Sequence, residues 1–330
     1  MTEVFTGIHK LQTEIPNSPL GHINSYLVQG EDGPILIDTG WNTEEAFQSL
    51  TGQLNEIGVA LQDIRQIVIT HVHPDHYGLV DRLREFSSAE IRLHPLEKEI
   101  ITFRYLHTEE YLRRMQQWLR TNGVPADLVS AAWGMPLDTT KLVPALPAIS
   151  LLQEGDTIST GKFDLRVVWT PGHSPGHICL YESKQKILFS GDHVIPGITP
   201  NISLSPSSGA NPLGDFFSSL DKVKALDVSL VLPGHAEPLG NLAKAIETVV
   251  HHHDFRIGEM LRALSTGPKT AYDVSTEMTW MLDEGGTAFQ NLTPRNKSLA
   301  IMEALAHLEA MRIDGRVKKY TRENLVYYSV

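Results

Sequence analysis

The segment His71-Val72-His73-Pro74-Asp75-His76 places four potential metal ligands within six residues. It follows Gln66–Thr70, a short apolar and β-branched run that predicts a buried strand. Pro74 opposes continuation of that strand and suits a turn. Three imidazoles and a carboxylate therefore gather where a strand gives way to a loop, and clusters with this spacing indicate a metal site. The competing interpretation is a polar loop that is rich in histidine by chance.

Three further segments repeat this arrangement of an apolar strand, a small or turn-forming residue and a ligand-type side chain. They are Thr170–His177 after the run Leu165–Trp169, Ser190–His193 after Ile187–Phe189, and Pro233–His235 after Leu230–Leu232. Strand ends with glycine turns are where an α/β scaffold places its chemistry. Four coincidences of this kind favour a metal site over accidents of packing.

In this order the segments resemble the metallo-β-lactamase-fold hydrolase superfamily. The shared features are the H-x-H-x-D-H cluster, a later histidine in a TPGH-x-x-GH-like turn, an aspartate after a strand and a final histidine, over roughly residues 20–240. The resemblance implies an α/β fold, a four-layer αβ/βα sandwich, with a two-metal site along one edge of the paired sheets. More narrowly, the chain resembles glyoxalase II-like and endoribonuclease-like members that carry a winged-helix-like tail.

Carried over to this chain, the resemblance implies two groups of ligands that share one aspartate. The first group is His71, His73 and His173, the second is Asp75, His76 and His235, and Asp192 bridges the two. Imidazole and carboxylate ligands without a thiolate favour Zn²⁺, with two ions per chain, although iron and manganese also accept them. The coordination positions left open are typical of a catalytic site.

The expected chemistry is hydrolysis by a metal-bridging hydroxide. Two dications about 3.5–4 Å apart lower the pKa of a shared water towards neutrality, and one of them can polarise a carbonyl or phosphoryl oxygen. Asp192 would partly offset the positive charge, and Asp75 would bind metal and orient the hydroxide, so these two are the predicted catalytic residues. No serine or cysteine nucleophile is required, and the only cysteine, Cys179, is expected to be a buried small hydrophobe.

Four other residues are expected near the metals. His177 is predicted to orient a ligand through a hydrogen bond, and His193 either lines the pocket or only packs. Tyr77 could donate to a developing oxyanion, although packing is favoured. Asp38, at the end of an early strand, is expected to be a supporting or turn residue rather than a ligand.

The remaining sequence divides into a catalytic scaffold, residues 1–240, and a C-terminal region, residues 241–330. Early strands are expected at Ile23–Val28 and Pro34–Ile37, on either side of a turn. The loop Pro196–Asn211 directly follows Asp192 and is therefore expected to lie close to the site.

An insertion in the scaffold, about residues 96–147, predicts helices over Glu97–Arg120 and Pro125–Trp133, whereas Met135–Pro147 with its three prolines resists regular structure. We interpret the helices as a lid whose apolar side chains are available for an acyl or aromatic group. These side chains are Phe103, Tyr105, Met115, Trp118 and Trp133. Simple packing of the helices onto the sandwich is the alternative.

The C-terminal region predicts helices followed by a small hairpin. Leu242–Leu264 has helical spacing, so His251–His253 fan around the helix and cannot chelate one ion together. A second helix is expected at Leu299–Met311. Residues 295–323 carry seven lysines or arginines against four acids, an excess that could contact phosphates; packing or formation of a homodimer are the alternatives.

Composition indicates a water-soluble enzyme. A chain of 330 residues with 41% hydrophobic residues can form a large domain and a small one. Neither a signal peptide nor a membrane-spanning stretch is evident, and a single cysteine is compatible with the cytoplasm, the predicted location. The net charge of −11 argues against a protein whose whole surface binds nucleic acid.

Three functions compete. The favoured one is a zinc-dependent hydrolase of a small carbonyl substrate: a thioester, ester or lactone. The alternative is a metal-dependent phosphodiesterase, an endoribonuclease, motivated by the basic tail. An iron-dependent oxidoreductase of the persulfide dioxygenase or flavodiiron kind ranks third, because His73 stands where flavodiiron sites carry glutamate. Penicillin-type β-lactamase activity is disfavoured, because Asp192 stands where such enzymes usually carry cysteine.

Overall fold

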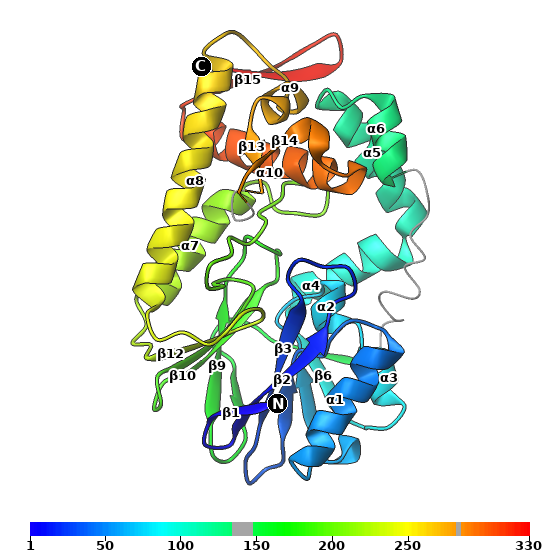
Figure 1. Cartoon of the computed structure of the whole chain (residues 1–330), viewed down its shortest axis with the longest axis vertical. Coiled ribbons are helices and arrows are strands. Elements are labelled where there is room, and N and C mark those ends of the chain that lie inside the picture. Colours follow the sequence, from blue (N-terminus) through cyan, green and yellow to red (C-terminus); the bar gives the residue numbers. More distant parts are fainter. Residues whose placement is uncertain (134–147, 282–284) are drawn as a thin grey trace.

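Two β-sheets face each other in the computed structural model, which describes residues 1–133, 148–281 and 285–330 (Figure 1). The first sheet runs in chain order: β1 (Thr2–Phe5), β2 (Ile8–Glu14), β3 (His22–Val28), β4 (Ile35–Ile37), β5 (Gln66–Val68), β6 (Glu90–Leu93) and β7 (Ile149–Leu151). The second has the order β12 (Leu230–Pro233), β11 (Ile187–Gly191), β10 (Ile178–Glu182), β9 (Asp164–Trp169) and β8 (Thr157–Ser159). Both early strands and all four strands expected before the ligand segments are present, with ends shifted by one or two residues.

Helices cover the outer face of each sheet. Successive strand side chains point to opposite faces: Ile35 and Ile37 pack towards the second sheet, while Leu36 packs under α1 (Glu44–Glu56) and α3 (Val80–Arg84). The outer face of the second sheet is covered by α7 (Pro212–Lys224) and the start of α8 (Leu242–Leu264). The layers are therefore helix, sheet, sheet and helix, which confirms the predicted four-layer sandwich.

The insertion departs from the predicted helix over Glu97–Arg120. The structure divides it into α4 (Pro95–Ile100), a π-helical segment (Ile101–Leu106) and α5 (Thr108–Thr121), followed by α6 (Ala126–Trp133). The π-helical segment is rich in β-branched and aromatic residues, which are weak helix formers. The predicted irregular stretch Met135–Pro147 lies outside the described residues.

The five apolar side chains expected to line a lid pack instead against hydrophobic clusters. Met115 is fully buried, and Phe103, Trp118 and Trp133 pack against the same cluster, which is shared with the C-terminal helices. Tyr105 packs against the helices of the first sheet. Packing is therefore observed for all five, mainly in the cluster with the C-terminal helices, and the lid stays a prediction.

The C-terminal region continues the helical layer formed by α5 and α6 (Figure 1). It contains α8, α9 (Ala271–Thr276), α10 (Pro294–Ile313) and two hairpins, β13 (Thr279–Trp280) with β14 (Thr287–Ala288) and β15 (Lys318–Arg322) with β16 (Leu325–Ser329). One end of α8 belongs to the core of the second sheet and the other to the helical cluster. A boundary at residue 240 stays a prediction, and shared cores extend across it. Within the described ranges, every helix is too short or too polar to cross a bilayer.

Helices α8 and α10 contribute side chains both to the helical cluster and to the core of the second sheet, which predicts that the helical layer and the sandwich unfold together. Leu305 on α10 is 1% exposed, so Leu305→Ala should lower the free energy of unfolding by about 2–5 kcal/mol. Phe255→Ala on α8, where the side chain is 48% exposed, should change it by less than about 0.5 kcal/mol. Denaturant unfolding followed by far-ultraviolet circular dichroism and tryptophan fluorescence should give one shifted transition. A second transition that Leu305→Ala leaves in place would contradict the shared core.

Candidate metal centre

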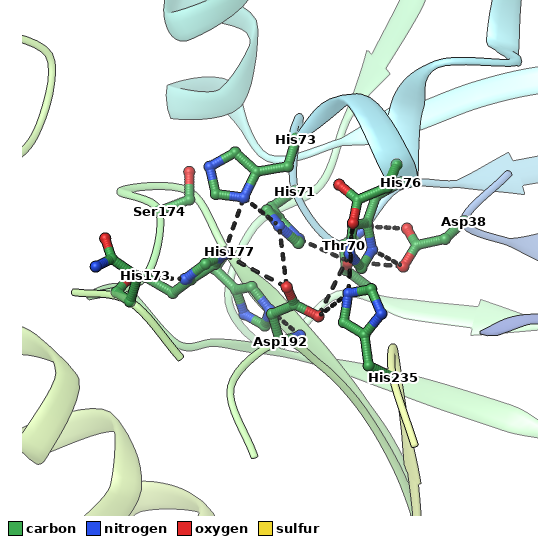
Figure 2. Close-up of polar contacts among 12 residues, drawn as sticks. Asp38, Thr70, His71, His73, His76, His173, Ser174, His177, Asp192 and His235 are labelled. Atoms are coloured by element: carbon green, nitrogen blue, oxygen red, sulfur yellow. Dashed lines mark hydrogen bonds and ion pairs between the residues drawn. The ribbon is translucent and has the colours of Figure 1, made fainter. Parts of the chain in front are cut away.

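The carboxyl ends of β5, β9, β11 and β12 meet at one edge of the paired sheets. After β5 the chain turns into the single-turn helix α2 (Pro74–Tyr77). The loops that leave these four strands bring the seven predicted ligands together (Figure 2). They form two groups: His71, His73, His173 and Asp192, and Asp75, His76 and His235.

Three imidazole nitrogens converge in the first group. Nδ1 of His73 lies 2.9 Å from Nε2 of His71 and 2.9 Å from Nε2 of His173. A single proton on His73 can serve only one of these two contacts.

The Nδ1 atoms of His71 and His173 point away from His73, and their hydrogen bonds show where the protons of these two rings lie. His173 Nδ1 donates to the carbonyl of Asn201 at 3.0 Å. The Thr70 hydroxyl donates to Asp38, so Nδ1 of His71, 3.1 Å away, donates to Thr70. Both Nε2 atoms therefore present lone pairs to the centre, an arrangement that a cation stabilises and that hydrogen bonds alone cannot satisfy.

The second group is oriented in the same way. His76 Nδ1 donates to Asp38 Oδ2 at 2.8 Å, and His235 Nδ1 donates to the carbonyl of His22 at 2.8 Å. Their Nε2 atoms face Asp75 Oδ2 at 3.9 and 3.4 Å.

Asp192 lies between the groups, as Figure 2 shows. Its Oδ2 is 3.9 Å from His71 Nε2 and 3.6 Å from His173 Nε2. Its Oδ1 is 3.3 Å from His76 Nε2 and 3.4 Å from His235 Nε2. Each oxygen of the Asp192 carboxylate thus faces a different ligand group.

The donor atoms fit a pair of cations. His76 Nε2, His235 Nε2 and Asp192 Oδ1 are buried and make no hydrogen bond within the described part of the chain. Buried polar atoms without a hydrogen bond are costly, and cations bound by these atoms would remove that cost. Gly234 keeps the space open, because a Cβ there would lie 2.7 Å from Asp192 Oδ1.

Burial and charge divide the imidazoles into two protonation classes. Burial lowers the pKa values of His71, His73 and His173 below the usual imidazole value. Burial also acts to lower the pKa of His76 and His235, but the nearby carboxylates, led by Asp192, outweigh it. They raise the pKa of His76 well above its usual value and that of His235 to about 10.

Of the four supporting residues predicted, Asp38 and His177 contact the site. Asp38 has a left-handed backbone with φ of 57° and binds His76 and Thr70. The backbone N–H of Asp192 donates to His177 Nε2 at 3.1 Å, so His177 positions the carboxylate that lies between the groups.

The other two predicted residues lie in packed surroundings. Tyr77 is fully buried in the core beneath α1 and α3. His193 is also fully buried, and its ring packs against Phe216 with centroids 5.1 Å apart. The histidines of α8 diverge as predicted, with His252 near Glu303 and His253 hydrogen-bonded to His307. Cys179 is buried, and burial raises its thiol pKa to about 12.

Glu97 is a supporting residue that the sequence did not reveal. Its fully buried carboxylate accepts from the backbone N–H of Val72 and of Gly176, each at 2.8 Å, and from the hydroxyl of Ser174. It therefore ties the loop of His71 to the loop of His173. Its position in the first turn of α4 gives no sequence signal for this role.

Metal binding should release protons. In the metal-free protein His76 and His235 hold protons at pH 7 because their pKa values are raised, and a cation at Nε2 must displace them. We expect release of about two protons per chain at pH 7, and weaker binding as the pH falls. Calorimetric titration with Zn²⁺ in buffers of different ionisation enthalpy measures this number. Binding without proton exchange would contradict the assigned protonation.

Comparisons with known proteins agree with this geometry. The sequence profile described as Metallo-beta-lactamase superfamily matches residues 18–235. The chain is 30% identical to the probable metallo-hydrolase YqjP of Bacillus subtilis, over 94% of this chain and 93% of that protein. It is also 30% identical to the human acyl-coenzyme A thioesterase MBLAC2, over 66% of this chain and 74% of that protein.

Solved structures extend the similarity to nearly the whole chain. The metallo-beta-lactamase family protein TTHA1429 of Thermus thermophilus has a TM-score of 0.83 and 29% identity, covering 99% of both chains. This chain therefore belongs to the Metallo-beta-lactamase superfamily, as a metal-dependent hydrolase.

Proposed function

We propose that this protein is a dinuclear zinc hydrolase of small carbonyl substrates, and that thioesters are preferred over esters and lactones. The observation that carries the proposal is the position of Asp192, with one oxygen directed to each group of imidazoles. The acyl-coenzyme A thioesterase among the relatives supports a thioester substrate.

Zinc is proposed because the donor atoms are imidazole nitrogens and carboxylate oxygens, with no thiolate. When bound, two such ions would lower the pKa of water towards neutrality and polarise the substrate carbonyl. If the native protein contained iron or manganese, the proposed identity of the metal would change, while the proposed hydrolysis would stand.

Asp75 is proposed to take up the proton of the attacking water. Its side chain is 13% exposed, against none for His76 and His235, so it borders the open side of the group. Burial acts to raise the pKa of Asp75, but His76 and His235 outweigh it and lower the pKa. The Asp75 carboxylate is therefore ionised at neutral pH and can accept a proton.

Three hydroxyl groups around the centre are engaged elsewhere and do not supply a proton to a leaving group. Thr70 donates to Asp38, Ser174 donates to Glu97, and Tyr77 lies in the core. None of these three hydroxyls is available to protonate a leaving oxygen or nitrogen. A thiol with a pKa of about 8.5 leaves as the thiolate far more readily than an alcohol leaves as the alkoxide, which supports a thioester.

The subgroup with a winged-helix-like tail, and with it phosphodiesterase activity, is the second candidate. The order α9, α10 and hairpin β15–β16 supports such a tail. Ion pairing weakens the case that this tail binds nucleic acid, because four of the seven basic residues in residues 295–323 lie next to acidic residues. These pairs are Arg312 and Lys319 with Glu309, Arg316 with Asp314, and Arg322 with Glu323.

Removing a proposed ligand should abolish turnover and leave the fold intact. Asp192→Ala and His73→Ala should each lower kcat/KM for a thioester by more than about a hundredfold, beyond the loss typical of an outer-sphere partner. His251→Ala, which removes an exposed histidine of α8, should retain wild-type activity. Circular dichroism checks the fold of each variant. Full activity in either ligand variant would refute the assignment.

The substrate class is tested by one panel on zinc-reconstituted protein. Acyl thioesters, aryl esters, lactones and labelled single-stranded RNA are compared, with Asp192→Ala as control. We expect turnover of the carbonyl compounds, fastest for thioesters. RNA cleavage that is lost in the control and falls steeply with salt, as phosphate contacts release counterions, would establish the phosphodiesterase instead.

A further inference from the structure

A pocket of about 520 Å³ lies in the helical layer, between helix α5 and the turn of the hairpin β15–β16. This volume is within the range of about 300–1,000 Å³ that is typical of sites for small molecules. None of the lining residues belongs to the two metal groups, so the pocket is separate from the metal centre. The lining residues are Arg113, Gln116, Gln117, Arg120, Thr121, Asn324 and Leu325.

Helical spacing places the two arginines on one side of α5. Arg113 and Arg120 are seven positions apart, and residues with this spacing share a face of a helix. Tyr111, Met115 and Leu119 bury another face of α5 in the helical cluster. The packing of α5 therefore turns both arginines outwards, with their Cα atoms about 10 Å apart along the helix axis.

Both guanidinium groups are without a counter-charge in the part of the chain that the structure describes. Arg113 and Arg120 are exposed, and neither forms an ion pair or a side-chain hydrogen bond with a described residue. By contrast, the neighbouring Arg114 pairs with Glu110. In a chain with a net charge of −11, two unpaired guanidinium groups beside one cavity favour an anionic ligand.

The hairpin supplies a further donor from the opposite wall. Glu323 and Asn324 have φ of 51° and 64° and lie between the paired residues Arg322 and Leu325. Positive φ at both central residues is typical of a two-residue type I′ turn. The turn places Asn324 at the pocket, whereas the carboxylate of Glu323 lies 3.5 Å from Arg322 and does not line the pocket. Arginine is thus the only charged residue type among the lining residues.

We propose that this pocket binds a small anion with two adjacent phosphate groups, a diphosphate. Each guanidinium fork would bind one phosphate, the pairing for which arginine geometry is suited. Each phosphate group offers several strong acceptor oxygens. The side-chain amides of Gln117 and Asn324, which donate to no other described residue, would bind the remaining oxygens.

Other ligand classes fit the pocket less well. Two guanidinium groups would repel a cation, and a single carboxylate would use only one of the two forks. Single-stranded nucleic acid is bound by aromatic side chains on which its bases stack, and the residues that line this pocket include no aromatic side chain. A long strand would also extend onto the surface of an acidic protein.

A series of ligands that differ only in phosphate number tests the proposal. Adenosine, AMP and ADP are titrated calorimetrically into the zinc-reconstituted protein. ADP should bind, AMP should bind about tenfold more weakly because one charge-assisted contact is lost, and adenosine should not bind. Inorganic pyrophosphate should displace ADP, because the diphosphate rather than the base is recognised. Binding is measured without turnover, so the outcome does not depend on the proposed hydrolysis.

Three variants of α5 locate the site. Arg113→Gln and Arg120→Gln should each weaken the binding of ADP about tenfold, because each removes one guanidinium contact. Arg114→Gln is the matched control: it makes the same change of charge on the same helix, but Arg114 pairs with Glu110 and does not line the pocket. It should bind ADP as the wild type does. Thermal melting checks the fold of each variant.

Four results would overturn the proposal. The first is unchanged affinity for ADP in both Arg113→Gln and Arg120→Gln. Equal weakening in Arg114→Gln would show general attraction of anions rather than a site. Binding that is lost in Asp192→Ala and retained in the arginine variants would place the anion at the metal centre. Single-stranded RNA that binds more tightly than ADP and is released by the same arginine substitutions would make the surface a nucleic-acid site instead.

Discussion

The need to hold lone pairs and negative charges together in a buried space governs this structure. Two imidazole nitrogens, of His71 and His173, lie within hydrogen-bond distance of His73 Nδ1, and Asp192 faces both ligand groups. Such an arrangement is unfavourable unless cations bind or protons fill it. Without metal, protons fill the second group, because nearby carboxylates raise the pKa values of His76 and His235. Cations bound by the same atoms would replace those protons, so affinity for metal and pH are coupled.

The rest of the fold keeps these side chains in place. Asp38, the carbonyl of His22 and the carbonyl of Asn201 each accept an outer imidazole proton, which fixes the ring orientation. Glu97 ties the loops of the two sheets together. The helical layer of the insertion and the C-terminal region packs as one cluster.

The residues of the two His/Asp groups could be predicted from the sequence because each follows an apolar run that forms a strand, so their strand-end positions are local information. Two supporting residues, Asp38 and His177, could be predicted as well, whereas Glu97 and Asn201 could not. Glu97 acts on backbone groups 25 and 79 residues away along the chain, and Asn201 contacts Glu303 across 102 residues. The division of the predicted helix into α4, the π-helical segment and α5 could not be predicted because apolar spacing continues through all three. The partner of the insertion helices could not be predicted for a related reason: apolar spacing shows that a face is buried, but not which partner covers it.

The most direct measurement is anomalous diffraction at the zinc absorption edge from crystals of zinc-reconstituted protein. The account predicts two peaks per chain. One lies among His71, His73 and His173, the other among Asp75, His76 and His235, and Asp192 lies between them. A single peak, or peaks away from these side chains, would contradict the two-cation centre on which the proposed chemistry depends.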